Sequence, residues 1–271
     1  MSWIEQLIKI IVLGLIQGFT EWLPISSTGH LKLTERLLQF SSPKDSLIFD
    51  FALHIGTLIV VIFFFRREIR EILRALARLD FKTKDGKMMP LIVAGTIPAI
   101  AVGFLLEKTV ETRIAQNFTL IATAFILCGI VLYITKMGEE KTDEISFSKA
   151  IIVGVAEGIA IIPGLSRSGL TIAAALLLGL KREKAFKFSF LLSIPAVIGA
   201  IGYTFYTEYE ALASAGLGLT ETLVGVIVSM VVGYFALKIL WRTLAVKKFH
   251  LFAFYCWLVG VLLIVLSLSG F

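Results

Sequence analysis

A polar stretch inside an apolar segment constrains this chain more than any other feature of its sequence. Residues 17–30 carry an amide, a carboxylate, four hydroxyls and an imidazole, and the segments around them are apolar. Of the 271 residues, 57% are hydrophobic and 17% are charged, whereas soluble domains are about 45–50% apolar and about 25% charged. The chain is therefore expected to be an integral membrane protein, in which ionisable residues need a partner or a function.

The polar stretch occurs a second time, about 140 residues further along the chain. Small or polar residues stand at matching positions in the two copies. They are Gly14, Gln17, Gly18, Ser26, Thr28 and Gly29, aligned with Gly154, Glu157, Gly158, Ser166, Ser168 and Gly169. Polar, Gly/Pro-broken hydrophobic segments in corresponding halves of a chain point to a binding site near the membrane midplane.

Both copies are expected to form helix hairpins that enter the membrane and return to the same side. In the first copy, Pro24 ends one helix and Ser26 opens the next, and residues 25–40 are too few for a full span. A span needs about 20 residues across about 30 Å of hydrocarbon. A re-entrant hairpin over 3–40 fits this length, and residues 150–181 form its counterpart.

Six longer apolar runs complete the prediction, three after each hairpin. They lie at 47–65, 88–106, 118–136, 185–206, 220–240 and 250–270. Because three crossings are an odd number, the second half is inserted upside down relative to the first. The expected fold is an all-α polytopic membrane protein with six transmembrane helices plus two re-entrant helix hairpins. It is one membrane domain made of two inverted repeats, about 1–140 and 141–271.

The basic residues indicate which loops face the cytoplasm. The loop over 66–87 carries eight of them, Arg66, Arg67, Arg70, Arg74, Arg78, Lys82, Lys84 and Lys87. The loop over 207–219 carries Glu208 and Glu210 but no basic residue, so it is expected outside. The first hairpin then enters from outside and the second from the cytoplasm, and their tips can meet. The net charge of +6 is therefore explained by basic loops that set the membrane topology. No nucleic acid is expected as a partner.

The first tip gathers groups that suit an anion. Gln17 and Glu21 are four residues apart and share one helix face. The hydroxyl-bearing residues 26–28 open the next helix, where free N–H groups and the positive end of the dipole favour negative charge. His30 lies on the first turn of that helix, near the same point.

The second tip adds a guanidinium and a second carboxylate. Arg167 offers a planar fork for a phosphate, so it predicts a phosphate or diphosphate site together with Ser166, Ser168 and the two helix N-termini. Glu21 and Glu157 beside such a site predict a divalent cation that bridges carboxylate and substrate oxygens. This mixture of groups favours catalysis over simple anion binding.

These residues resemble the paired motifs of a known family. The run Gln-x-x-x-Glu-x-Leu-Pro-Ile-Ser-Ser-Thr-Gly-His, followed by Pro-Gly-Leu-Ser-Arg-Ser-Gly-x-Thr, is similar to that of the undecaprenyl-diphosphate phosphatases, also called bacitracin-resistance proteins. The similarity covers essentially the whole chain. It implies an enzyme that removes the terminal phosphate of undecaprenyl (polyprenyl) diphosphate, recycles the lipid carrier for cell-wall synthesis and confers bacitracin resistance.

The resemblance also implies roles for individual residues. The central ones are Glu21, Ser27, His30 and Arg167, and the supporting ones are Gln17, Ser26, Thr28, Ser166 and Ser168. It further implies a requirement for Mg²⁺ or Ca²⁺, a location in the cell membrane and a site that opens to the extracytoplasmic side. A homodimer is kept open as a partner.

Three questions stay open from the sequence. The attacking group is Ser27 with His30 as base, or His30 itself, or a water that His30 activates. The function is that of a phosphatase, of a transporter or scramblase for a prenyl phosphate, which an inverted repeat also suits, or of both; two acids argue against a small-anion channel. His54 and Asp50, near the outer end of the first full span, are assigned an interfacial or packing role, with support of the site as the alternative.

Overall fold

The computed structural model describes residues 3–40, 43–83, 85–209 and 218–269. Two residues counted in the predicted loop charges, Lys84 and Glu210, lie outside the described residues. In the described part no strand forms, and an isolated bridge joins Thr142 to Leu180. The helices are α1 (Trp3–Trp22), α2 (Ser27–Leu38), α3 (Pro43–Phe64), α4 (Arg66–Ala77), α5 (Met88–Thr109), α6 (Phe118–Ile134), α7 (Phe147–Ile159), α8 (Arg167–Leu177), α9 (Arg182–Thr207), α11 (Leu219–Ala245) and α12 (Phe252–Leu268).

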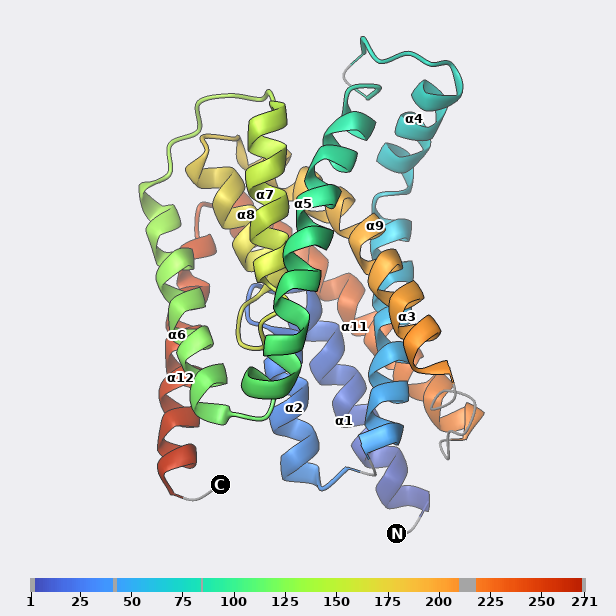
Figure 1. Cartoon of the computed structure of the whole chain (residues 1–271), viewed down its shortest axis with the longest axis vertical. Helices are drawn as coiled ribbons and strands as arrows, with labels where there is room; N and C mark the ends of the chain where they lie inside the picture. The colour runs from blue at the N-terminus through green and yellow to red at the C-terminus, as the bar shows by residue number, and fades with distance from the viewer. Residues whose placement is uncertain (1–2, 41–42, 84, 210–217, 270–271) are drawn as a thin grey trace.

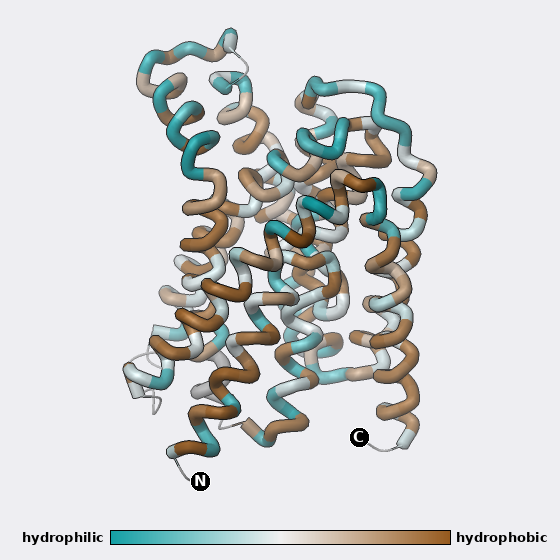
Figure 2. Tube along the Cα trace, turned by 180° about the vertical axis from the view of Figure 1, so that it is seen from behind, coloured by the Kyte–Doolittle hydropathy of each residue, from teal (hydrophilic) through white to brown (hydrophobic). Residues whose placement is uncertain are grey.

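The predicted all-α polytopic membrane architecture is confirmed. Six helical stretches of the described residues are long and apolar enough to cross a membrane: Trp3–Trp22, Met88–Ile114, Phe118–Met137, Arg182–Thr207, Leu219–Ala245 and Phe249–Leu268. Helix α3 and helix α4 together form a further candidate span, bent by 74°. Hydrophobic residues fill the middle of the molecule, and hydrophilic ones gather at the end that carries α4 (Figure 2).

Helix α1 is long enough to cross a membrane, yet it belongs to a hairpin. Figure 1 shows α1 running from the end of the molecule that holds the N-terminus to the middle, where the chain turns and α2 returns to the same end. Helix α7 enters from the opposite end, and α8 returns to that end. The two hairpins therefore approach each other from opposite sides, as the odd number of crossings predicts.

The two hairpins use the same packing twice. Helix α1 packs along α11, and α7 packs along α5, so each hairpin lies on the later part of the other half of the chain. A Cβ added to Gly18 would lie 2.8 Å from the carbonyl oxygen of Ser229, and one added to Gly158 would lie 2.7 Å from that of Ala99. Glycine therefore allows the close helix contact in both places, which holds the two tips at a common depth.

The predicted loop over 66–87 begins as a helix. Helix α4 is amphipathic, because Ile72 and Ala75 face the protein while Arg70 and Arg74 are exposed. It follows α3 after the single residue Phe65, which is buried at 2% exposure. The basic end of the molecule is thus a structured surface helix followed by a short loop.

The glycine contacts give a direct stability test. Replacing Gly158 by Ala puts a methyl group against the Ala99 carbonyl, and overpacking of this kind costs about 1–3 kcal/mol. Gly103→Ala is the matched control, since it gains the same helix propensity, about 1 kcal/mol, and nothing lies within 4 Å of its new Cβ. We expect a lower midpoint of thermal unfolding in detergent for Gly158→Ala only. Equal midpoints would show that the α5–α7 contact is not close-packed.

Candidate active site

The tips of the two hairpins touch through two matched serines. Ser26 caps α2, and its hydroxyl accepts hydrogen bonds from the N–H of Gly29 at 3.4 Å and from that of Gly164, in the second tip, at 2.9 Å. Ser166 caps α8 and donates to the carbonyl of Leu23, in the first tip, at 3.4 Å. The prediction that the tips meet is confirmed. Ser26 and Ser166, two of the three serines predicted to bind phosphate, are buried at 2% exposure and join the tips.

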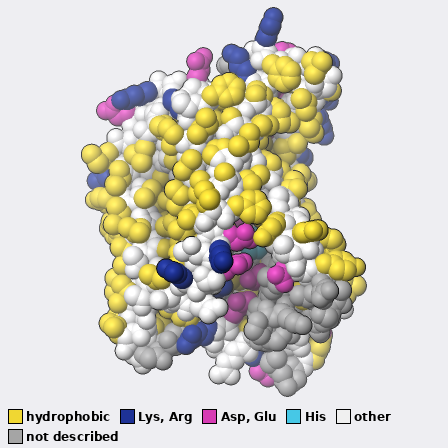
Figure 3. Space-filling model, viewed as in Figure 1, with side chains coloured by type: hydrophobic (Ala, Val, Ile, Leu, Met, Phe, Trp, Pro, Cys, Tyr) yellow, Lys and Arg dark blue, Asp and Glu magenta, His cyan; other side chains and the backbone are white. Residues whose placement is uncertain are grey.

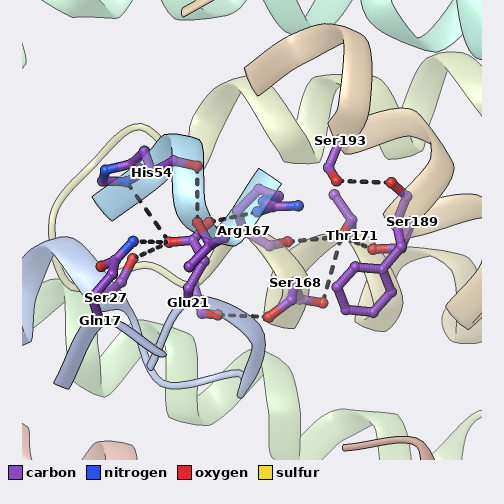
Figure 4. A network of polar contacts seen from close by, with 12 residues as sticks. Gln17, Glu21, Ser27, His54, Arg167, Ser168, Thr171, Ser189 and Ser193 are labelled. Carbon is purple, nitrogen blue, oxygen red and sulfur yellow. Dashed lines mark hydrogen bonds and ion pairs between the residues drawn. The ribbon is translucent and has the colours of Figure 1, made fainter. Parts of the chain in front are cut away.

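A cluster of polar groups surrounds the carboxylate of Glu21 (Figure 4). One carboxylate oxygen, Oε1, lies 2.7 Å from Nη2 of Arg167. The other, Oε2, accepts hydrogen bonds from the Ser27 hydroxyl at 2.7 Å and from Nε2 of Gln17 at 3.2 Å. Only 8% of the Glu21 side chain is exposed. The structure therefore brings four of the predicted residues together, from α1, α2 and α8.

The guanidinium of Arg167 reaches Glu21 with one nitrogen only. Its second terminal nitrogen, Nη1, is buried and has no hydrogen-bond partner among the described residues. The group also lies over the ring of Trp22, with Cζ 5.3 Å from the ring centroid. A buried donor without a partner is costly, so this nitrogen is available for a ligand oxygen. The remaining N–H groups at the start of α8 add to the attraction for an anion.

His54 is part of the cluster, although the sequence favoured a packing role for it. Its Nε2 lies 3.8 Å from Oε2 of Glu21. Its Nδ1 is 2.7 Å from the carbonyl oxygen of Asp50 and donates to it, because a carbonyl only accepts. A signal was present in the repeat, since His54 aligns with Ser193, and both are polar positions within apolar runs.

His30 does not join the cluster around Glu21. Its Nδ1 donates to the carbonyl of Ser26 at 2.8 Å, and its Nε2 lies 2.9 Å from the hydroxyl of Tyr255 in α12. The ring of Phe125 packs edge-on at a centroid distance of 5.3 Å. Both ring nitrogens are therefore engaged with the protein.

Two further predicted residues, Thr28 and Ser168, and the neighbouring Thr171 lie around this centre. Thr28 is exposed on the first turn of α2, whereas Ser168 is fully buried with its hydroxyl 3.2 Å from that of Ser166. Thr171, one turn into α8, donates to the carbonyl of Arg167 at 2.7 Å.

Glu157 lies beside a cavity that Arg167 also lines. The cavity measures about 420 Å³ and is bounded by α5, α7 and α9. Most of its lining residues are apolar, such as Ile100 and Phe104. Tyr203, near the C-terminal end of α9, also lines it. One carboxylate oxygen of Glu157 is buried without a hydrogen-bond partner among the described residues. Figure 3 shows acidic side chains around a hollow in the lower half of this face.

The donor set suits a cation that is shared with a ligand. The described residues contain no group of three or more His, Cys, Asp or Glu side chains that could hold a metal by themselves. However, Glu21 and Glu157 both interact with Arg167, and unpartnered acceptor oxygens remain on Glu157 and Gln17. Mg²⁺ is commonly held by one or two carboxylates together with substrate phosphates, and these residues fit that pattern.

Comparison with known proteins gives a consistent set of relatives. A family model described as "Bacitracin resistance protein BacA" matches residues 10–262. A protein of Carboxydothermus hydrogenoformans named "Undecaprenyl-diphosphatase" is 40% identical over 266 residues, which are 97% of this chain and 98% of the relative. The protein of that name from Thermodesulfovibrio yellowstonii is 37% identical, with the same coverage. "Undecaprenyl-diphosphatase 3" of Bacillus cereus is 38% identical over 99% of both chains.

Alanine substitutions at the adjacent residues Ser26 and Ser27 distinguish a structural role from a chemical one. Ser26→Ala leaves the buried N–H of Gly164 without its acceptor, which costs about 1–3 kcal/mol. Ser27→Ala removes a hydroxyl whose partner Glu21 keeps Arg167 and Gln17, so a smaller loss is expected. Thermal unfolding in detergent should therefore give a clearly lower midpoint for Ser26→Ala than for Ser27→Ala. A midpoint for Ser26→Ala as high as that for Ser27→Ala would contradict the role of Ser26 in joining the tips.

Proposed function

The chain belongs to the bacitracin resistance protein BacA family, and from this premise we propose that it is an undecaprenyl-diphosphate phosphatase. It hydrolyses undecaprenyl diphosphate to undecaprenyl phosphate and inorganic phosphate, and so recycles the lipid carrier for cell-wall synthesis. The observation that carries the proposal is the carboxylate of Glu21, held between the Arg167 guanidinium and the Ser27 hydroxyl where the two tips meet. A hydroxyl, a base within hydrogen-bond distance and a third group that orients the base form the usual arrangement for nucleophilic catalysis.

The substrate diphosphate would bind first to the free arm of Arg167. Nη1 of that residue is buried and unpartnered, and a phosphate oxygen satisfies it with a charge-assisted hydrogen bond. The starts of α2 and α8 supply backbone N–H groups to the same anion. The prenyl chain would follow the apolar cavity past Ile100 and Phe104 toward the lipid.

Ser27 is the nucleophile that the geometry favours. Its oxygen would attack the terminal phosphorus, its proton would pass to Oε2 of Glu21, and the bond from that phosphorus to the bridging oxygen would break. Glu21 would pass the proton to the departing undecaprenyl phosphate. In the second step Glu21 would take a proton from the attacking water and return one to the serine oxygen as phosphate leaves. The alternatives led by His30 have less support, because both its ring nitrogens are engaged elsewhere.

A divalent cation, Mg²⁺ or Ca²⁺, remains part of the proposal. Glu21 and Glu157 would hold it together with phosphate oxygens of the substrate. When bound, it would neutralise charge on the phosphates. The interaction of both acids with Arg167 supports this assignment.

We place the enzyme in the cell membrane with its site open to the extracytoplasmic side. Glu107 and Tyr203 line the cavity near the ends of α5 and α9. In Figure 1 these ends lie at the end of the molecule opposite the basic helix α4, which the positive-inside rule assigns to the cytoplasm.

The homodimer also remains a proposal, and the particle mass in detergent would test it. Bacitracin resistance is proposed from the family description, and expression in a sensitive bacterium should raise the tolerated dose.

Phosphate release from undecaprenyl diphosphate by the purified protein tests this function. We expect release with Mg²⁺ or Ca²⁺, at least a tenfold loss in chelator, and recovery on adding the cation back. Glu21→Gln should lose about 10²-fold or more, as is usual for a removed acid–base group. Glu140→Gln is the matched control, because Glu140 pairs with Arg182 away from the cavity, and it should keep its activity. No release by the unaltered protein, or full release by Glu21→Gln, would refute the proposal.

Reorientation of the lipid phosphate across the membrane is a second candidate. The internal repeat aligns Phe64 and Phe65, at the end of α3, with Tyr203 and Thr204 in α9. Tyr203 and Thr204 line the open cavity, whereas Phe65 is buried against Phe190, with ring centroids 5.8 Å apart. The region around the end of α9 is thus open, whereas the equivalent region around the end of α3 is closed. A transporter that alternates between two sides of the membrane has such an arrangement in one of its states. The test is reorientation of a labelled prenyl phosphate in vesicles by Glu21→Gln; a rate equal to that of empty vesicles would exclude it.

A further inference from the structure

A second hollow lies at the opposite end of the α5–α9 seam, under helix α4. It measures about 370 Å³ and is formed by α3, α4, α5 and α9. Twelve of its thirteen lining residues are apolar, and Thr96 is the exception. The lining residues include Ile62, Leu73, Val93 and Ile198. A hollow of this kind on a membrane-facing surface suits a hydrocarbon chain.

A basic hollow adjoins the apolar one. Its lining residues are Ile62, Arg66, Ile69, Arg70, Leu73, Arg74 and Ala77, and three of these, Ile62, Ile69 and Leu73, also line the apolar hollow. The arginines follow one another at intervals of four residues, so they lie along one face of α4. In Figure 3, Lys and Arg side chains stand at the upper end of the molecule above hydrophobic ones.

The charge in the basic hollow is not neutralised by the protein. Arg66 donates to the carbonyl of Phe63 at 3.0 Å, but no ion pair of the described residues involves Arg70 or Arg74. No acidic side chain lines either hollow. Of the two acids in α4, Glu68 is paired with Lys187 at 3.2 Å, and Glu71, three residues before Arg74, lines neither hollow. Among the side chains that line the two hollows, an anion would therefore meet positive charge alone.

We propose that the two hollows together bind one anionic phospholipid of the leaflet on the α4 side. Its phosphate would lie on Arg70 and Arg74, and an acyl chain would lie in the apolar hollow between α5 and α9. Basic pockets between transmembrane helices on the cytoplasmic side are the usual form of such sites. The occupant is a structural lipid and not the substrate, because the carboxylates that serve the phosphatase are absent here.

Bound lipid would fasten α4 to the helices beneath it. Only Ile72 and Ala75 of this helix are buried, so the protein alone gives it few apolar contacts. A ligand that binds only the folded arrangement stabilises it in proportion to its concentration. The lipid would thus complete the packing of α4 on α3, α5 and α9.

Binding of phosphatidylglycerol by the whole purified protein tests the proposal, with phosphatidylcholine as the neutral probe and native mass spectrometry as the readout. The variant Arg70→Gln/Arg74→Gln should bind phosphatidylglycerol about 30-fold more weakly. Each arginine would lose a direct hydrogen bond to the lipid phosphate worth about 1 kcal/mol, which is about fivefold in affinity. The matched control, Arg67→Gln/Arg78→Gln, loses the same charge from α4 and its C-cap outside both hollows and should change binding less than twofold.

Filling the apolar hollow gives an independent check. Val93→Trp should weaken phosphatidylglycerol binding at least tenfold, and phosphate release from the diphosphate substrate should stay unchanged in all these variants. If both double arginine variants lost phosphatidylglycerol affinity equally, the effect would come from general surface charge. That result would overturn the proposed site. No preference over phosphatidylcholine would overturn it as well. Displacement of phosphatidylglycerol by an equal amount of undecaprenyl phosphate would assign the hollows to the prenyl lipid and refute the phospholipid.

Discussion

The partly buried ion pair between Glu21 and Arg167 is the interaction on which the rest of the structure depends. It joins α1 of the first hairpin to the start of α8 in the second, at 2.7 Å. Removing two charges from water is expensive, and the pair is favoured only if further hydrogen bonds complete it. Ser27 and Gln17 complete it on the side of Glu21. On the side of Arg167, one buried nitrogen has no hydrogen-bond partner among the described residues.

This pair requires two hairpins that stop at the same depth from opposite sides. Gly18 and Gly158 allow that approach by bringing helix backbones into contact, and Ser26 and Ser166 then bond each tip to the other. Non-helical backbone is tolerated inside a membrane only where protein or a wet cavity surrounds it. The joined tips meet that condition, and they bring the N-termini of α2 and α8 together.

Much of this centre could be predicted from the sequence because local patterns determine it. The four-residue spacing of Gln17 and Glu21 defines a helix face, and the repeat defines which tip faces which. Contacts between distant segments could not be predicted in the same way. The hydroxyl that occupies His30 comes from Tyr255 in the last helix, and only the packing of α3 beside the tips brings His54 to Glu21. The contact with Tyr255 leaves no spacing pattern in the chain, and at His54 the repeat marks a matched polar position but not its partner.

In the proposed mechanism, Glu21 holds Ser27 ready to attack the terminal phosphorus. Rapid quenching of a single turnover with labelled undecaprenyl diphosphate, followed by peptide mapping, tests it most directly. A transient phosphate ester on Ser27, absent from Ser27→Ala and still formed by His30→Gln, is the predicted result. Phosphate attached to His30, or turnover with no phosphorylated residue at any time, would contradict the account.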